Sequence, residues 1–223
     1  MSFNEQTLSV VIGGHSGIGQ AVAAALSQRP GRVLVASRRN GLDIADEAAV
    51  ERYFAALGPV DHVVFTAGSQ APGGFLSGLD LAAARAAFDA KFWGSLAVAR
   101  AVAGRLRAGG SLTLTSGFLA RRTLPGTLVK TAMNAALEAS AKVLAREFAP
   151  QRVNIVSPGL TDTAAYAAMD VTARQAMLER AATSLPAGRH GRAEDIAQGY
   201  LLAIDNPFMT GAVIDLDGGA LIQ

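Results

Sequence analysis

The chain has 223 residues, of which 50% are hydrophobic and none is cysteine, and its formal net charge is +2. Such a composition suits a single domain over residues 1–223 and excludes a disordered protein, while the lack of thiols excludes disulfides and thiolate metal sites. The small net charge, without a charged leader or an 18-residue apolar run, predicts a cytoplasmic protein whose partners include neither nucleic acid nor membrane.

Short apolar, β-branched runs alternate with helical patterns along the whole chain. The predicted strands are 8–13, 31–37, 61–68, 110–117, 151–159 and 211–219. The predicted helices are 17–28, 46–57, 79–107, 124–149, 169–183 and 193–204. Nearly continuous apolar strands indicate a parallel sheet that is covered on both faces. Right-handed crossovers then make it a Rossmann-type, doubly wound α/β fold.

A glycine-rich turn separates the first predicted strand from the first predicted helix. Its sequence is Gly13-Gly14-His15-Ser16-Gly17-Ile18-Gly19. Glycines here let the backbone approach a pyrophosphate, and the helix N-terminus offers free N–H groups and the positive end of its dipole. We therefore expect a dinucleotide to bind at this turn, with a purely structural glycine turn as the alternative.

The spacing G-x-x-x-G-x-G resembles that of the short-chain dehydrogenase/reductase (SDR) family, and the resemblance extends along the whole chain. Residues 65–68 (FTAG) stand where the family has N-N-A-G beside the cofactor ribose, and residues 158–163 resemble its P-G-x-x-x-T segment, which holds the nicotinamide amide. Residues 185–219 are similar to its closing segment. The resemblance assigns to the cofactor site Gly13, His15, Ser16, Gly17, Ile18, Gly19, Thr66, Ala67, Gly68, Pro158, Gly159, Leu160, Thr161 and Thr163.

The tip of the second strand bears on the choice of nicotinamide. NAD-preferring turns place an acid about 20 residues beyond the glycine turn, whereas this chain has Arg38 there. A guanidinium binds a 2′-phosphate by paired, charge-assisted bonds, so we expect NADPH/NADP rather than NAD, with Ser37 adding a contact. Alternatively, Arg38 and Arg39 are surface charges and Asp43 serves NAD. In the family, however, a segment like Asp43–Ile44 more often meets the adenine.

The region after the second strand is shorter than the family pattern. Only three residues separate Arg39 from Asp43, where SDR proteins typically have a helix and a further strand. We predict that this helix is missing and that the edge strand is reduced to a stub at Leu42–Ile44. The sheet should then have six full strands, in the family order without its third.

The stretch KTAMN places Lys130 and Asn134 four residues apart, on one face of a helix. In the SDR pattern these are the positions of the catalytic Tyr and of the Lys that lowers its pKa. The position of the family's Ser holds Gly117, beside Ser116, and that of its relay Asn holds Lys91. Lys and Asn have thus exchanged positions: Lys91 replaces the family's Asn, and Asn134 replaces its Lys. This resembles the ketoreductase domains of modular polyketide synthases, which make the same exchange and remain active.

Lys130 is therefore predicted to be the proton donor of a lysine-centred site. Burial beside a second ammonium would help it release a proton, and its charge would stabilise a developing alkoxide. Ser116 could supply a hydroxyl if the loop shifts by one residue, and Tyr166 could approach in space. The alternatives are that Lys130 is a solvated charge and Asn134 an inert polar residue.

These residues predict an NADPH-dependent oxidoreductase that reduces a ketone, an aldehyde or an imine of a small molecule by hydride transfer. The alternatives are a catalytically silent NADPH sensor or scaffold, and nucleotide-sugar or other non-redox chemistry. No residues stand at metal-ligand spacing, so no metal is expected.

The C-terminal part and the long helices support two further expectations. Residues 160–190 should form a substrate lid, which is short for a large sugar nucleotide. Helices 79–107 and 124–149 carry apolar residues on more than one face, with Phe92 and Trp93 on the first. The resemblance implies a homodimer or homotetramer through these helices.

Overall fold

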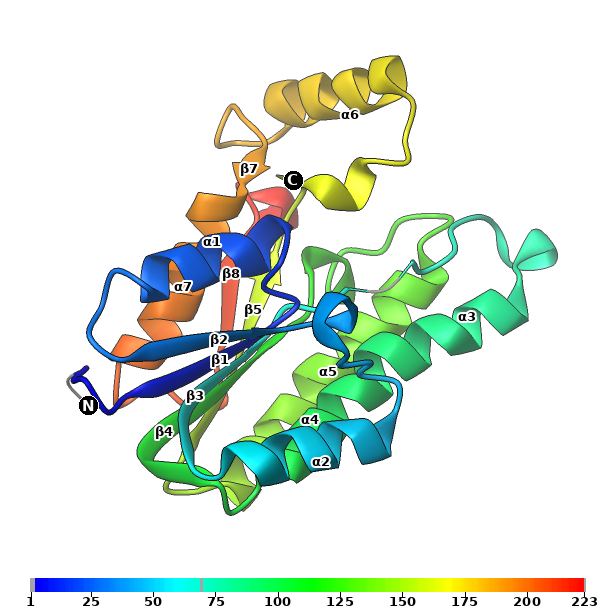
Figure 1. Ribbon diagram of the computed structural model, residues 1–223. Helices are drawn as coiled ribbons and strands as arrows, with labels where there is room; N and C mark the ends of the chain where they lie inside the picture. Colours follow the sequence, from blue (N-terminus) through cyan, green and yellow to red (C-terminus); the bar gives the residue numbers. More distant parts are fainter. Residues whose placement is uncertain (1–2, 69, 223) are drawn as a thin grey trace.

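The computed structural model describes residues 3–68 and 70–222 and shows a six-stranded parallel sheet in the order β2-β1-β3-β4-β5-β8 (Figure 1). The strands of this sheet are β1 (Leu8–Ile12), β2 (Arg32–Ala36), β3 (Val60–Phe65), β4 (Leu106–Thr115), β5 (Arg152–Pro158) and β8 (Val213–Leu216). This confirms the predicted doubly wound fold, with six full strands in the expected order. A separate pair, β6 (Thr161–Asp162) and β7 (Gly191–Arg192), was not predicted.

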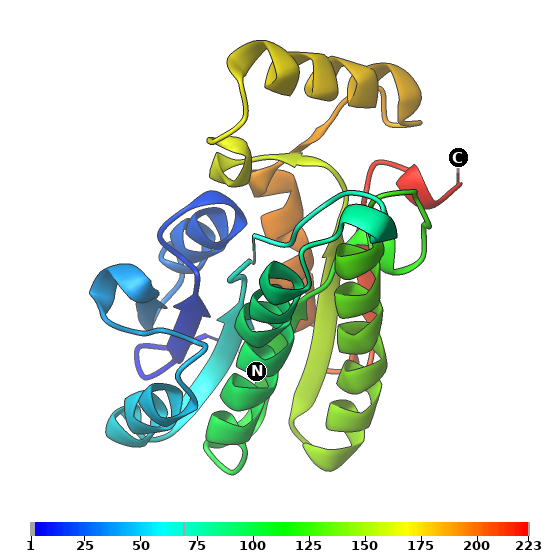
Figure 2. The ribbon, with the colours of Figure 1, turned by 90° about the vertical axis from the view of Figure 1, so that its right-hand side faces the viewer.

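Helices cover both faces of the sheet (Figures 1 and 2). They are α1 (Gly17–Leu26), α2 (Glu47–Leu57), α3 (Leu81–Phe88), α4 (Gly94–Val102), α5 (Leu128–Glu147), α6 (Val171–Ser184) and α7 (Ala193–Asp205). Because side chains alternate along a strand, Val10 and Ile12 belong to the core under α2, α4 and α5, whereas Val11 belongs to the core under α1 and α7. No described helix is both long enough and apolar enough to cross a membrane.

The segment after β2 replaces the expected edge-strand stub. A 3₁₀ turn (Arg38–Asn40) follows β2, and within the described chain residues 42–44 form no strand. Asn40 accepts a hydrogen bond from the Ser37 backbone N–H and donates one to the Val35 carbonyl, each at 2.7 Å. Leu42 and Ile44 are buried in the core. The described chain thus has no α-helix and no full edge strand between β2 and α2, as predicted. The predicted stub at 42–44 is not formed, because these side chains are buried without strand pairing.

The predicted helix 79–107 is divided by a π-helical turn. α3 passes into the turn Asp89–Trp93 and then into α4, which ends at Val102, and β4 begins at Leu106 instead of residue 110. A π turn inserts one extra residue into a helix and is frequent at functional sites. Here it contains Lys91.

Candidate active site

A cleft of about 830 Å³ opens at the carboxyl ends of the parallel strands. Five strands contribute to its lining at their carboxyl ends. Ile12, Thr115 and Pro158 are the last residues of β1, β4 and β5, and Ser37 and Thr66 directly follow β2 and β3. β1 pairs with β2 on one side and β3 on the other, so the chain changes its direction of winding here. Doubly wound folds bind ligands at this point, and the volume suits a cofactor or small-molecule site.

The structure brings nearly all of the predicted site residues to this cleft. Those that line it are Gly13, His15, Ser16, Gly17, Ile18, Gly19, Ser37, Arg38, Asp43, Ile44, Thr66, Ala67, Gly68, Lys91, Ser116, Lys130, Asn134, Pro158, Gly159, Thr161 and Thr163. Leu160 is placed elsewhere. Its apolar side chain packs against the cluster of Ala181, Leu185 and Ala220, while its neighbours Gly159 and Thr161 line the cleft.

The glycine turn has the geometry that a close backbone approach requires. Gly13 has φ +84°, and a Cβ on it would lie 2.7 Å from the Ala67 nitrogen. A side chain at Gly19 would collide with the Thr66 hydroxyl, which instead donates to the Ile12 carbonyl at 2.8 Å. The side chain of Ser16 does not cap α1. The first N–H groups of α1 therefore remain available to an anion.

The segment after β5 lies directly against the glycine turn. A Cβ on Gly17 would lie 3.2 Å from the Cβ of Thr163, at a backbone φ of +52°. Thr163 thus lies against the N-terminus of α1, and both residues line the cleft.

The tip of β2 gives one end of the cleft a positive charge. Arg38 and Arg39 are exposed, line the cleft, and form no ion pair within the described residues. His15 Nδ1 and Ser37 Oγ are 2.8 Å apart, and this hydroxyl also accepts the Arg39 backbone N–H. Asp43 lines the same end, where its carboxylate accepts the backbone N–H of Ala45 at 3.0 Å.

Two of the chain's three lysines line the cleft, and Lys91 is the buried one. Its ammonium donates to the Ser116 carbonyl at 2.9 Å and to Asn134 Oδ1 at 2.7 Å. Burial, followed by the nearby charge of Lys130, lowers the pKa of Lys91 from 10.5 to about 8. Two N–H donors of the ammonium are thus used, and a third is available to the cleft.

Lys130 lies in the first turn of α5 and is exposed while lining the same cleft. No ion pair or hydrogen bond of its side chain is found within the described residues. The burial that was expected for Lys130 is therefore found at Lys91 instead. The π turn supplies the reason, because it places Lys91 below the start of α5 and against Asn134.

Ser116 contributes its carbonyl to the site, which corrects the expectation of a hydroxyl. Its Oγ donates to Glu138 Oε1 at 2.8 Å, and its backbone N–H donates to the Val156 carbonyl at 2.9 Å. At the next residue, Gly117, a Cβ would lie 2.9 Å from Asn134 Nδ2, so a serine there would require the Asn134 side chain to move. Glycine at position 117 therefore leaves the space that the Asn134 side chain occupies, so these two differences from the SDR pattern depend on each other.

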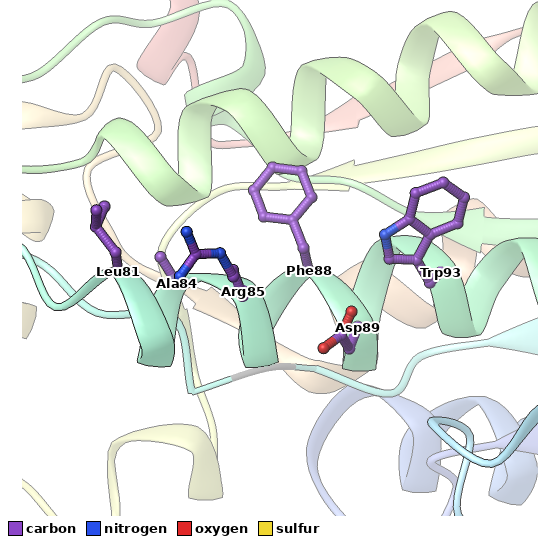
Figure 3. A pocket seen from close by; sticks show the side chains of 6 residues that line it. All are labelled: Leu81, Ala84, Arg85, Phe88, Asp89 and Trp93. Atoms are coloured by element: carbon purple, nitrogen blue, oxygen red, sulfur yellow. The ribbon is translucent and has the colours of Figure 1, made fainter.

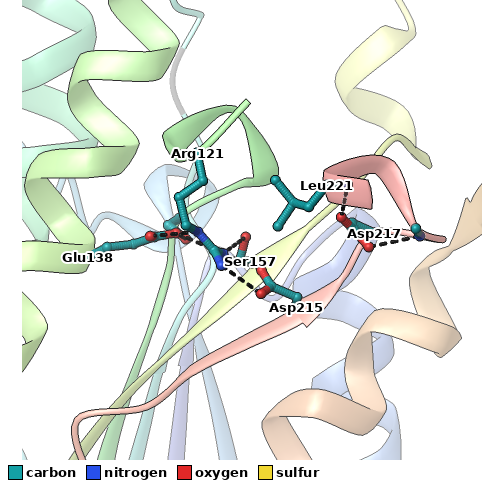
Figure 4. A network of polar contacts seen from close by, with 8 residues as sticks. Arg121, Glu138, Ser157, Asp215, Asp217 and Leu221 are labelled. Carbon is teal, nitrogen blue, oxygen red and sulfur yellow. Dashed lines mark hydrogen bonds and ion pairs between the residues drawn. The ribbon is translucent and has the colours of Figure 1, made fainter. Parts of the chain in front are cut away.

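A polar network behind Ser116, in part buried, was not predicted (Figure 4). The guanidinium of Arg121 bonds Glu138 Oε2 at 3.1 Å, forms an ion pair with Asp215, and reaches Ser157 Oγ at 3.2 Å. Glu138 is itself buried. The available signal was its spacing, since Glu138 follows Asn134 by four residues and shares its helix face.

Alanine side chains and one tyrosine form a further part of the wall. They are Ala71, Ala83, Ala86, Ala87, Ala90, Ala164, Ala165 and Tyr166. Burial, followed by the nearby charge of Asp162, raises the pKa of Tyr166. Tyr166 therefore keeps its proton at neutral pH, and its hydroxyl is a neutral group of this wall.

A second, shallower groove of about 480 Å³ lies on the outer side of α3 (Figure 3). Its lining residues are Leu81, Ala84, Arg85, Phe88, Asp89 and Trp93. Trp93 is 58% exposed, whereas the neighbouring Phe92 packs against the core. Of the two aromatic residues that were expected at an interface, only Trp93 faces outward.

Known proteins show the same architecture and related sequences. A sequence model described as enoyl-(acyl carrier protein) reductase matches residues 41–220. The chain is 30% identical over 260 residues to the short-chain dehydrogenase/reductase ATR9 of Stachybotrys chlorohalonatus, covering 96% of each protein. It is 30% identical to carbonyl reductase family member 4 of Danio rerio, covering 95% of this chain and 97% of that protein.

A solved structure of a small-chain dehydrogenase in complex with NADPH is similar throughout. It is 51% identical, with a TM-score of 0.96, and the match covers 98% of this chain and all of the other. The chain belongs to the short-chain dehydrogenase/reductase family of oxidoreductases.

Proposed function

We propose that the protein is an NADPH-dependent reductase of small carbonyl compounds that works with two lysines. The observation that carries this proposal is the arrangement of Lys91. Its buried ammonium is fixed by Ser116 and Asn134 in the same cleft that Lys130 and the glycine turn line. A fixed, desolvated cation beside the end of a dinucleotide cradle suits charge stabilisation in a reduction.

The residues present fit NADPH. The missing Cβ atoms of Gly13 and Gly19 leave the space for a pyrophosphate, and the free start of α1 supplies N–H donors. The guanidinium groups of Arg38 and Arg39 would hold the 2′-phosphate beside the His15–Ser37 pair. The similar small-chain dehydrogenase binds NADPH. When bound, NADPH supplies the hydride.

Lys130 supplies the proton in this proposal. It stands where the SDR pattern has its tyrosine acid, and its ammonium is unrestrained by hydrogen bonds within the described chain. Lys91 remains attached to Ser116 and Asn134, and its fixed ammonium lines the same cleft as Lys130.

We also propose that residues 160–190 act as a lid and that the protein is a homodimer or homotetramer through α3, α4 and α5. Figure 2 shows α6 standing apart from the sheet, above the strand ends. Tyr166 and Thr163, which precede α6, line the cleft. Closure of this segment would exclude water from the reacting carbonyl.

The proposal is tested by comparing the wild-type enzyme with a Lys130→Ala variant on a panel of ketones and aldehydes. We expect kcat/KM to fall at least about 100-fold in the variant while the Kd for NADPH stays within about twofold. Lys142→Ala is the matched control, because it removes the third lysine from the exposed side of the same helix. Tight NADPH binding without turnover of any carbonyl compound would instead support a cofactor sensor.

A further inference from the structure

The charged residues that line the cleft lie at its two ends, and cations outnumber acids at both. Arg38, Arg39 and Asp43 lie at the β2 end, and Lys91 and Lys130 lie at the other. Asp43 is the only carboxylate among the described lining residues. The catalytic end therefore carries two ammonium groups and no acid.

The acids that lie near the catalytic end are bound elsewhere. Glu138 accepts from Ser116 and pairs with Arg121. Asp162 pairs with Arg174 on α6. Asp89 belongs to the outer groove of α3 (Figure 3). No described carboxylate is left to neutralise the two lysines, so the charge at this end can be balanced only from outside the chain.

This surplus is larger than in the SDR pattern. There the four catalytic positions hold one lysine, with neutral Ser, Tyr and Asn. Here the corresponding positions hold Gly117, Lys130, Asn134 and Lys91, which adds one positive charge. Lys130 is exposed, but its ammonium faces the buried ammonium of Lys91, and an anion bound beside both would offset their repulsion. NADPH would place its phosphates at the glycine turn and at the β2 end, so the substrate is the component that can bring an anion to this end.

We propose that the substrate is a 2-oxo acid, whose carboxylate is bound by Lys130. This inference rests on the proposed reductase function. An ammonium has three N–H donors and no acceptor, so one lysine can hold the carbonyl oxygen and a carboxylate oxygen of the same 2-oxo acid. The remainder of the substrate would lie against alanine side chains such as Ala83, Ala87 and Ala90.

The reaction then balances with the groups already named. The carbonyl carbon receives a hydride from NADPH, which is oxidised to NADP⁺, and the carbonyl oxygen receives a proton from Lys130. The C=O double bond becomes a C–O single bond, the carboxylate is unchanged, and the product is a 2-hydroxy acid. Lys130 regains its proton from solvent.

Binding of unreactive analogues tests the carboxylate site without turnover. Oxamate carries a carboxylate beside its carbonyl group, and oxamide is its neutral counterpart. With NADPH present, we expect calorimetry to give a Kd for oxamate at least about 30-fold below that for oxamide. Lys130→Met should remove this difference, whereas Lys130→Arg and the matched control Lys142→Met should keep it. Equal binding of the two analogues, or full preference in Lys130→Met, would overturn the inference.

Turnover separates failure of this inference from failure of the proposed function. The wild-type enzyme should reduce a 2-oxo acid with a kcat/KM at least about 30-fold above that for its methyl ester. Equal rates on acid and ester would overturn the inference and leave a carbonyl reductase. Lys130-dependent oxamate binding without reduction of any carbonyl compound would overturn the reductase function, and with it the assignment of the 2-oxo acid as substrate.

Discussion

At the scale of single residues, the arrangement of Lys91 links the proposed catalysis to stability. Its ammonium is buried in the π turn and held by two fixed acceptors, the Ser116 carbonyl and Asn134 Oδ1. Burial lowers the pKa of Lys91 to about 8, whereas an unfolded chain keeps it near 10.5. Between these two values the unfolded state binds more protons than the folded state. Linkage then requires the stability to rise with pH across this window.

Substituting Lys91 with Met should remove this pH dependence. From pH 7 to pH 9.5 the free energy of unfolding of the wild type should rise by about 2 kcal/mol relative to Lys91→Met. Urea unfolding of both proteins at the two pH values measures it. Lys142→Met, which removes an exposed lysine, controls for the lost charge. If wild type and Lys91→Met keep a constant difference, Lys91 titrates as an ordinary lysine.

The sequence predicted which residues line the cleft, but not which of their side chains are buried. Lys130 and Asn134 could be assigned to one helix face from their spacing, and Lys91 was expected to approach from the other helix. Which amine is buried depends on the extra residue of the π turn, and the apolar pattern around it continues as in an ordinary helix. The direction of the Ser116 hydroxyl depended on Glu138, whose role is visible only once α5 is packed.

At the scale of elements, α5 connects the cleft to the C-terminal strand. Asn134 and Glu138 share one face of the helix and hold Lys91 and Ser116, respectively. Arg121 extends the chain of contacts from Glu138 to Asp215 at the end of β8. We propose that Glu138 is a positioning residue, because its carboxylate fixes Ser116, whose carbonyl in turn orients Lys91.

A double-mutant cycle tests this role. Ser116→Ala and Glu138→Gln should each lower kcat about tenfold, and the double variant should lose little more, because both changes disturb one chain of contacts. The alkaline limb of the pH–kcat profile should shift to lower pH in each, since a less well-held ammonium is easier to deprotonate. Multiplicative losses with an unchanged pH profile would show that Glu138 is only structural.

Most elements could be predicted from periodicity, and the exceptions have local causes. The six strands were found because each is a short apolar run beside a turn. β6 and β7 are two residues long, which is too short for any period to be visible. Leu42 and Ile44 have the alternation of a strand. However, the Asn40 side chain bonds the Val35 carbonyl and the Ser37 N–H, which are the nearest backbone groups at the end of β2. The burial of these two side chains was predictable, whereas their pairing was not.

At the scale of the whole molecule, several large apolar side chains are exposed along the side of the sheet that α3, α4 and α5 cover. Trp93 follows α3, Leu81 begins it, and Leu128 and Val143 belong to α5; each is more than half exposed. Exposed apolar side chains gathered on neighbouring helices are typical of an interface between subunits. Phe208, beyond α7, is 96% exposed and lies in a different part of the chain.

Light scattering coupled to size exclusion should therefore give a dimer or tetramer for the wild type. Trp93→Glu should shift the population toward monomer, because a carboxylate would be buried without a partner in the assembled state. Phe208→Glu is the matched control, since it adds the same charge at an exposed aromatic residue outside these helices, and it should leave the assembly intact. A monomeric wild type, or dissociation by Phe208→Glu alone, would show that the helices α3 to α5 do not form the interface. Dissociation by Trp93→Glu with NADPH binding retained would further show that each subunit folds its own cofactor cleft.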